Sequence, residues 1–143
     1  MKQGVLPIIT NLLCYDGVKW EKNIWPNKTI MRSNMVDGDQ IYSGSCKEFD
    51  YWFRKVGKIH YTSISKVKNV FDEKENEEIW KIFKFNNKIH LQLFNEIFVL
   101  DNNKIKKTKL AFLILYYFIV GNQLLIASVE KGIYKRLILR LKK

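Results

Sequence analysis

The residues of this chain that could do chemistry are aromatic rings interleaved with small polar groups. They are Trp20, Trp25, Tyr42, Ser43, Ser45, Tyr51, Trp52, Phe53 and Trp80. Planar bases stack on aromatic side chains for about 1–3 kcal/mol each, and hydroxyl or amide groups can read the edge of an extruded base. For any single ring, packing in the core is the simpler interpretation. Both interpretations stay open at this point: core residues, or the wall of a pocket for a flat ligand.

Residue patterns typical of catalysis are absent from the sequence. It contains no Gly-rich phosphate loop, HExxH, GxSxG or recognisable carboxylate pair. His60 and His90 lie in separate segments without a neighbouring nucleophile, and Cys14 and Cys46 lack the spacing of a zinc site. We therefore expect no enzyme activity, no metal and no cofactor.

The charge of the chain favours a polyanionic partner. Its 143 residues carry 25 Lys and Arg against 14 Asp and Glu, a net charge of +11. Such a field attracts nucleic acid first and an anionic membrane surface second, although a biased composition would give the same count. No secretion signal is evident, and the apolar run Leu110–Val120 is shorter than a membrane span. We expect a cytoplasmic protein without a membrane partner.

The length predicts one domain, residues 1–143, with strands outnumbering helices. The expected strands are Gly4–Thr10, Lys58–Val70, Trp80–Leu93 and Leu124–Ala127, with a tight turn at Asp37-Gly38-Asp39. The expected helices are Tyr15–Lys22, Leu110–Val120 and a final one after Ser128 with Ile133, Leu137, Ile138 and Leu141 inward. The segment Cys46–Lys58 has no clear period and reads as a loop or hairpin extension. No internal repeat is evident, and the pattern favours a mixed β-barrel or curved sheet with packed helices.

The order of several motifs resembles EVE domains of the PUA-like group. The motifs are VLPIITN at Val5–Asn11, VKWEKNIW at Val18–Trp25 and VDGDQIYSG at Val36–Gly44. The similarity continues through KIHYTSISKVKNVFDE, IWKIFKFNNKIHLQ and the final apolar segment, so it covers nearly the whole chain. One departure is Pro26, which stands where the family commonly has Gly.

The resemblance implies an α+β fold, a PUA-like/EVE twisted β-barrel flanked by helices, with a pocket for a base. Trp25 would wall this pocket, Asn11 and Ser43 would bond the base edge, and Tyr42 would lie beside them. Composition alone adds Trp52 and Phe53 as further walls. The cations that would hold phosphates are Lys19, Lys22, Lys28 and Arg32.

The function that the resemblance implies is a non-enzymatic reader of a modified base, with methylation as the expected modification. DNA is favoured over RNA, and the base would be flipped into the aromatic pocket. Such domains occur alone or as specificity modules of McrBC-type restriction systems, so a restriction NTPase or nuclease is an expected partner. The alternatives are an RNA-binding PUA-like module and a basic protein-interaction domain without base recognition.

Overall fold

A computed structural model describes residues 4–8, 10–74, 76–136 and 141–142, and most of these residues lie in β-strands. The strands of the first half are β1 Gly4–Ile8, β2 Asn11–Tyr15, β3 Trp20–Ile24, β4 Ser33–Asp37, β5 Gln40–Ser45, β6 Glu48–Lys55 and β7 Lys58–Ser63. A one-turn helix, α1 Ile64–Val67, follows. The remaining strands are β8 Lys81–Phe85, β9 Lys88–Gln92, β10 Glu96–Asp101, β11 Lys104–Lys109, β12 Ile114–Val120, β13 Gln123–Ser128, β14 Ile133–Arg136 and β15 Leu141–Lys142.

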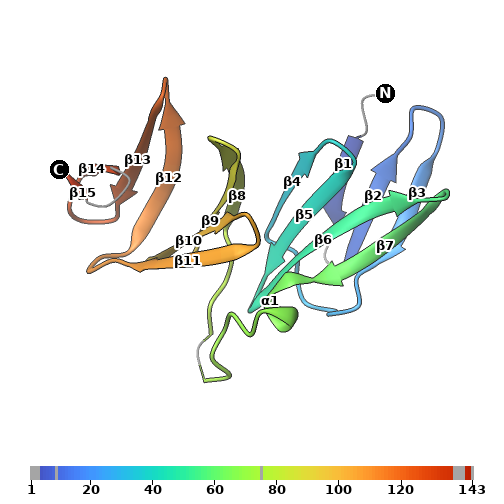
Figure 1. Cartoon of the computed structure of the whole chain (residues 1–143), viewed down its shortest axis with the longest axis horizontal. Helices are drawn as coiled ribbons and strands as arrows, with labels where there is room; N and C mark the ends of the chain where they lie inside the picture. Colours follow the sequence, from blue (N-terminus) through green and yellow to red (C-terminus); the bar gives the residue numbers. More distant parts are fainter. Residues whose placement is uncertain (1–3, 9, 75, 137–140, 143) are drawn as a thin grey trace. The chain divides into compact units, whose positions relative to one another are not determined.

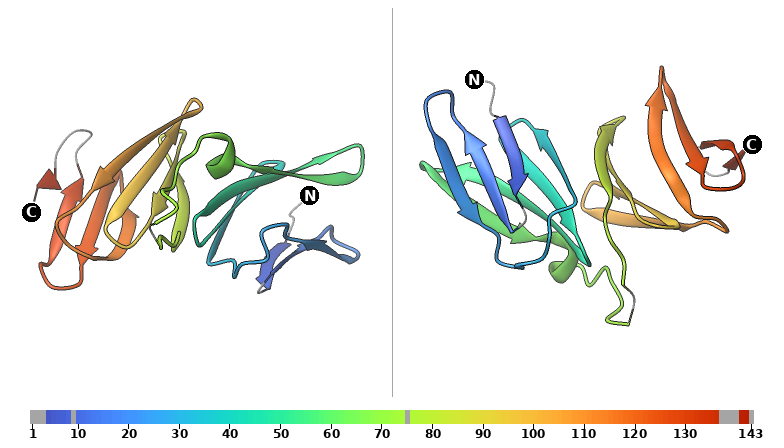
Figure 2. Two further views of the ribbon diagram at one scale, coloured as in Figure 1. Left: turned by 90° about the horizontal axis from the view of Figure 1, so that it is seen from below. Right: turned by 180° about the vertical axis from the view of Figure 1, so that it is seen from behind.

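The strands form four open antiparallel sheets, each built from strands consecutive in the chain (Figures 1 and 2). The first sheet is β1-β2-β3, and the others are β4-β5-β6-β7, β8-β9-β10-β11 and β12-β13-β14-β15. Successive four-stranded meanders are the strand pattern of β-propeller blades. The meander is therefore a structural repeat, which the sequence did not reveal.

Two-residue turns with left-handed backbone connect most neighbouring strands. Both central residues have positive φ in Asn86-Asn87 and Asn102-Asn103, as in type I′ turns. Gly38 and Gly121 each stand first in their turns with φ of 60° and 58°, the position at which a type II′ turn takes glycine. These turns match the twist of the flanking strands, so neighbouring strands within a sheet follow one another directly.

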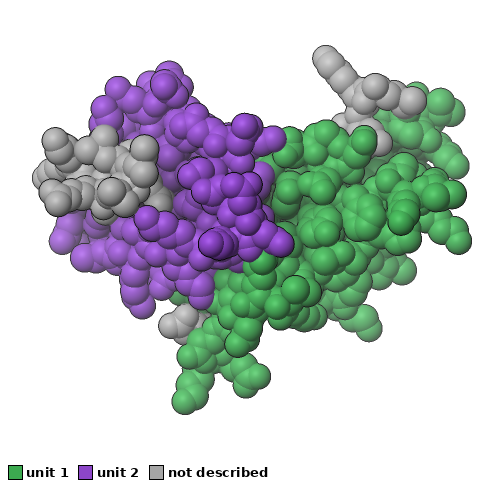
Figure 3. All heavy atoms as spheres, in the orientation of Figure 1, with its two compact units in different colours: residues 1–82 green, residues 83–143 purple. Residues whose placement is uncertain are grey.

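The chain divides into two compact units, residues 1–82 and 83–143 (Figure 3), and each has its own core. In unit 1, β1–β3 and β4–β7 enclose Leu12, Cys14, Trp25, Met31, Ile41 and Trp52. In unit 2, the sheets β8–β11 and β12–β15 enclose Ile97, Val99, Leu110, Ile114, Tyr117, Leu124 and Ile126. Each core thus fills the space between two consecutive sheets.

The predicted α+β fold, a PUA-like/EVE twisted β-barrel flanked by helices, is wrong. The described residues form open sheets rather than a closed barrel, and their one helix is a single turn. Tyr15–Lys22 is not a helix because Asp16 and Gly17 make the turn between β2 and β3, where the Asp16 carboxylate accepts backbone bonds from Val18 and Lys19.

The other two predicted helices are also strands where the structure describes them. Leu110–Val120 contains β12, and its apolar run reflects a strand with side chains on both faces of a sheet. The segment after Ser128 forms β14 and β15, with Ile133 in β14 and Leu141 in β15, while Leu137 and Ile138 lie outside the described residues. No described helix has the length and apolarity needed to cross a membrane.

Several predicted elements are confirmed. The turn at Asp37-Gly38-Asp39 joins β4 to β5, and the strands expected at Gly4–Thr10 and Leu124–Ala127 correspond to β1 and β13. Cys46–Lys58, expected as a loop or hairpin extension, is different: it contains β6, an inner strand of the sheet β4–β7. The strand expected over Lys58–Val70 ends at Ser63, whose hydroxyl caps α1.

Gly44 provides a test of the packing in unit 1. A Cβ at this position would lie 2.6 Å from Cγ2 of Ile79 and 2.8 Å from the Ser33 hydroxyl, whereas a Cβ at Gly4 would make ordinary contacts. We expect Gly44→Ala to lower the free energy of unfolding by about 1–3 kcal/mol, the usual cost of overpacking. Gly4→Ala is the matched control, and urea denaturation measures both. Equal stability of the two variants would contradict this packing.

Candidate functional site

The residues predicted to line a base pocket lie on opposite faces of the sheet β4–β7. Ser43 pairs with Asp50, and Trp52 lies two residues further along β6, so all three face the core of unit 1. Tyr42 and Phe53 face the other way. The structure therefore brings Trp25, Ser43 and Trp52 together but separates them from the other two predicted rings.

The three residues that meet are organised around the buried carboxyl group of Asp50. Trp25 is 0% exposed, and its Nε1 donates to Asp50 Oδ2 at 2.9 Å. The Ser43 hydroxyl donates to Asp50 Oδ1, and Trp52 Nε1 donates to the Ser43 hydroxyl at 2.9 Å. Buried indole N–H groups need acceptors, and this network supplies them. The arrangement holds the core together and leaves these indole rings no exposed face for a ligand.

A second carboxylate, Glu48, lies two residues before Asp50 on the same face of β6. It accepts from the hydroxyls of Tyr61 and Ser63 and pairs with Lys66 Nζ at 3.7 Å. Desolvation, with a smaller contribution from the charge of Glu48, raises the pKa of Asp50 to about 8. Asp50 is therefore predominantly protonated at neutral pH.

The opposite face of this sheet carries a row of half-buried rings. Tyr42, Tyr51 and Phe53 follow one another with ring centroids 6.2 and 5.8 Å apart, and Phe53 stacks on His60 at 5.3 Å. The Tyr42 hydroxyl donates to Gln40 Oε1 at 2.9 Å. Cross-strand contacts of this kind stabilise a sheet whether or not a ligand binds.

The remaining predicted site residues come from separate parts of unit 1. Asn11 lies at the start of β2, where register places it beside Ile24 of β3. Exposed Lys19 and Lys22 lie on the β2–β3 hairpin, and Lys28 follows β3 in the loop to β4. Arg32 is held by Glu78, with Nε 2.5 Å from Oε2, and its guanidinium lies 5.4 Å from the centre of the Trp80 ring.

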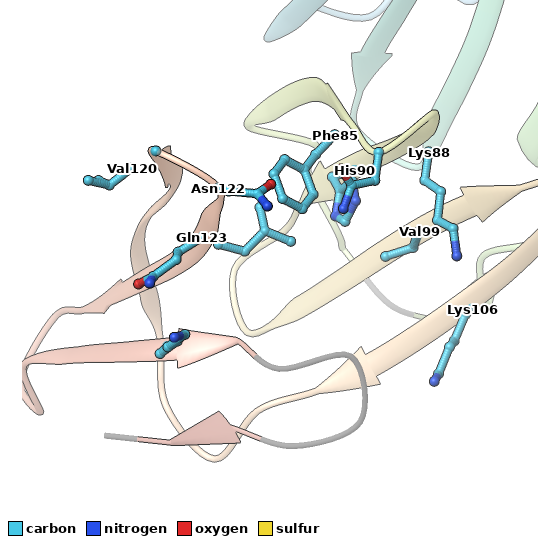
Figure 4. A pocket seen from close by; sticks show the side chains of 12 residues that line it. Phe85, Lys88, His90, Val99, Lys106, Val120, Asn122 and Gln123 are labelled. Carbon is cyan, nitrogen blue, oxygen red and sulfur yellow. The ribbon is translucent and has the colours of Figure 1, made fainter.

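Unit 2 contains a cavity of about 730 Å³ that the sequence did not predict. It lies at the end of the space between the sheets β8–β11 and β12–β15, beside the turns Asn86-Asn87 and Gly121-Asn122. Figure 4 shows Phe85, His90 and Val99 from one sheet, with Asn122 and Gln123 from the β12–β13 hairpin. Its volume is in the range of small-molecule sites, which are usually 300–1,000 Å³.

The strand register places two lysines of the cavity wall on one face of the sheet β8–β11. His90, Val99 and Lys106 form one row across β9, β10 and β11, and Lys88 lies on the same face two residues before His90. Lys88 Nζ pairs with Asp101 Oδ2 at 2.8 Å. The residues that line the cavity include lysines and neutral amides but no Asp or Glu.

His90 is fixed in the wall by its neighbours. Its Nδ1 lies 2.8 Å from the Tyr117 hydroxyl, and its ring stacks on Phe83 with centroids 5.2 Å apart. The backbone N–H of Tyr117 donates to Gln92 Oε1 at 2.9 Å. These buried contacts connect the sheets β8–β11 and β12–β15. They therefore make the wall that carries the lysines rigid.

The positive charge of the chain is concentrated in unit 2. Residues 83–143 contain 12 Lys and Arg against three Asp and Glu, a net of +9, whereas residues 1–82 contain 13 against 11, a net of +2. The basic run Lys104–Lys109 is the feature of the sequence that indicates this uneven distribution of charge. Among the described residues, no cluster of His, Cys, Asp and Glu could hold a metal ion.

Comparisons with known proteins give the fold and no family. No protein-family model and no curated protein matches the chain. Two crystal structures of the extracellular domain of BT4673 from B. thetaiotaomicron, described as a putative one-component and a putative hybrid two-component system, give TM-scores of 0.76 and 0.73. Each is 17% identical and matches 98% of this chain, which spans only 20% of that domain.

A third similar structure is the computationally designed Ika8 protein. It gives a TM-score of 0.55 at 7% identity, with 97% of this chain and 47% of that chain covered. Identities this low show the fold alone. The likeness to β-rich extracellular domains adds to the evidence against the PUA-like/EVE barrel.

The role of the Trp25 indole in the core can be tested with a conservative change. Trp25→Phe removes the donor to Asp50 and leaves a cavity, so we expect unfolding free energy to fall by about 2–4 kcal/mol. Trp20→Phe, at a position 51% exposed, is the control and should change stability little. Urea denaturation followed by circular dichroism measures both. A stable Trp25→Phe protein would show that the indole bond is dispensable.

The raised pKa of Asp50 predicts a pH-dependent stability. The folded protein keeps a proton that an unfolded Asp, with a pKa of about 3.9, releases, so stability falls by up to about 1.4 kcal/mol per pH unit between roughly pH 4 and 8. Asp50→Asn mimics the protonated form and should remove this part of the slope. Urea denaturation of both proteins at pH 5, 7 and 9 measures it. Parallel pH profiles would contradict the assignment.

Proposed function

We propose that the chain is a non-enzymatic recognition module that binds a polyanion, nucleic acid first, through unit 2. The observation that carries this proposal is the net charge of +9 on residues 83–143, the unit that also contains a cavity whose wall has no acidic residue. Lysines attract phosphate through a long-range field and release counterions on binding. Nothing in the comparisons bears on the ligand.

The edge strand β11 is the main surface for the phosphate backbone. It pairs with β10 alone and carries exposed Lys104, Lys106, Lys107 and Lys109. Register places Lys104 and Lys106 on the face of the cavity and the other two on the opposite face. Lys109 lies 3.6 Å from Glu96, so its charge is partly neutralised. A backbone that follows β11 would meet lysines along its full length.

Recognition of a methylated base in DNA remains part of this proposal, with its site moved to unit 2. Trp25 and Trp52 are buried in unit 1, although the sequence predicts them as walls of the pocket. Phe85, beside the cavity, is the ring that a base could contact instead. A cytoplasmic location and a restriction NTPase or nuclease as partner likewise stay proposals.

A ligand-sensing module is the second candidate, since two of the similar solved structures are of an extracellular domain of a putative one-component or hybrid two-component system. In such a protein the cavity of unit 2 would bind a small anionic ligand. The two candidates differ in their dependence on salt, because each phosphate contact with a single strand contributes about 0.7 to the slope of log affinity against log salt.

The polyanion proposal predicts that lysines of β11 matter more than equally exposed lysines elsewhere. Lys104→Gln with Lys107→Gln should weaken binding of a single-stranded oligonucleotide and lower the salt slope by about 1.4. Lys55→Gln with Lys58→Gln, on the β6–β7 hairpin of unit 1, removes the same charge and serves as the control. Fluorescence anisotropy between 50 and 200 mM salt measures both. Equal losses would mean that only total charge matters, and the proposal would be abandoned.

A further inference from the structure

We infer that the cavity of unit 2 is a binding site for a nucleoside monophosphate, either free or as one residue of a strand. This inference rests on the proposed function and names the ligand of its site. It joins three features of one cavity: an aromatic side chain, amide groups from two turns, and two lysines on one face of a sheet. Each feature suits one part of a nucleotide.

The base would contact Phe85. This ring belongs to β8 and meets His90 edge to face, with centroids 6.1 Å apart. This contact with His90 supports the Phe85 ring from the side of the sheet. Aromatic stacking accepts every base because all bases have a π-face. Phe85 therefore provides affinity without setting which base is chosen.

Amide side chains at the turns would read the edge of the base. Asn86 lies in the turn between β8 and β9. Asn122 lies in the turn between β12 and β13, and Gln123 follows it at the start of β13 (Figure 4). An amide offers both a donor and an acceptor, so it can bond a base edge of either polarity. The backbone is left-handed at Asn86 and Gly121, and these tight turns fix the positions from which the amide side chains extend.

The phosphate would bind Lys88 and Lys106, two of the three lysines that line the cavity. Lys106 makes no ion pair with any described residue, whereas Lys88 is paired with Asp101, and the side chains of that pair are 43% and 42% exposed. A half-exposed pair contributes little to stability, so an incoming phosphate can compete with Asp101 for the ammonium. Asp101 therefore weakens the site, and removing its charge should strengthen binding.

The test uses adenosine monophosphate, adenosine and inorganic phosphate, titrated into the full chain by isothermal calorimetry. We expect the monophosphate to bind more tightly than either part alone. Asp101→Asn should tighten it about three- to tenfold by releasing Lys88, and Lys106→Gln should weaken it by a similar factor. Phe85→Leu should weaken it roughly fivefold or more through lost stacking. Phe53→Leu, at a half-buried ring in unit 1, is the control.

The outcomes separate this inference from the proposed function. If oligonucleotides bind with a steep salt dependence but the monophosphate does not bind, or Asp101→Asn fails to tighten it, the cavity is not a nucleotide site and the β11 surface stands alone. If inorganic phosphate binds as tightly as the monophosphate and Phe85→Leu has no effect, the Phe85 ring takes no part in binding. The inference is then overturned. If neither an oligonucleotide nor the monophosphate binds, both proposals fail.

Discussion

Each sheet in this chain has an apolar face that its own strands cannot cover, and this constraint organises both units. Leu12 of the first sheet and Ile41 of the second share one core, and Val99 and Leu124 share the other. A sheet buries such a face by packing on another sheet. Short two-residue turns keep each meander compact, so the sheet that follows in the chain supplies the cover. Repetition of one simple unit thus explains why helices have almost no place in this fold.

The sequence predicted strands and turns better than helices for a definite physical reason. A continuous apolar run such as Leu110–Val120 has no period, so it fits a buried strand and a buried helix equally well. Tyr15–Lys22 contains an Asp-Gly pair of the same kind as the one that correctly placed the turn at Asp37-Gly38. The repeated Asn-Asn-Lys-Ile at Asn86–Ile89 and Asn102–Ile105 marks two hairpins, β8–β9 and β10–β11, which belong to one sheet.

The aromatic and serine residues of unit 1 show where residue types stop being informative. Trp25, Ser43 and Trp52 do converge, but they converge on a carboxylate that sequence reasoning passed over, since fully buried aspartates are rare. Whether a strand residue faces the core or the opposite side depends on register, and a shift of one residue exchanges the faces. Tyr42 and Ser43 are neighbours in sequence and lie on opposite faces for this reason. Composition identified the members of this hydrogen-bond network but not Asp50, the residue on which they converge.

The lysines of unit 2 have two physical explanations, and their positions distinguish them. Lysine on an edge strand such as β11 prevents pairing with another chain, and this purpose needs charge only at the edge. Lys88 lies on β9, an inner strand, on the face that also carries His90 and Lys106. Edge protection does not explain a lysine there, whereas the anion site that we propose beside the cavity would. The pairing of Lys88 with Asp101 fits the same view, because a cation at the wall of an otherwise acid-free cavity is held by a weak partner that a phosphate can displace.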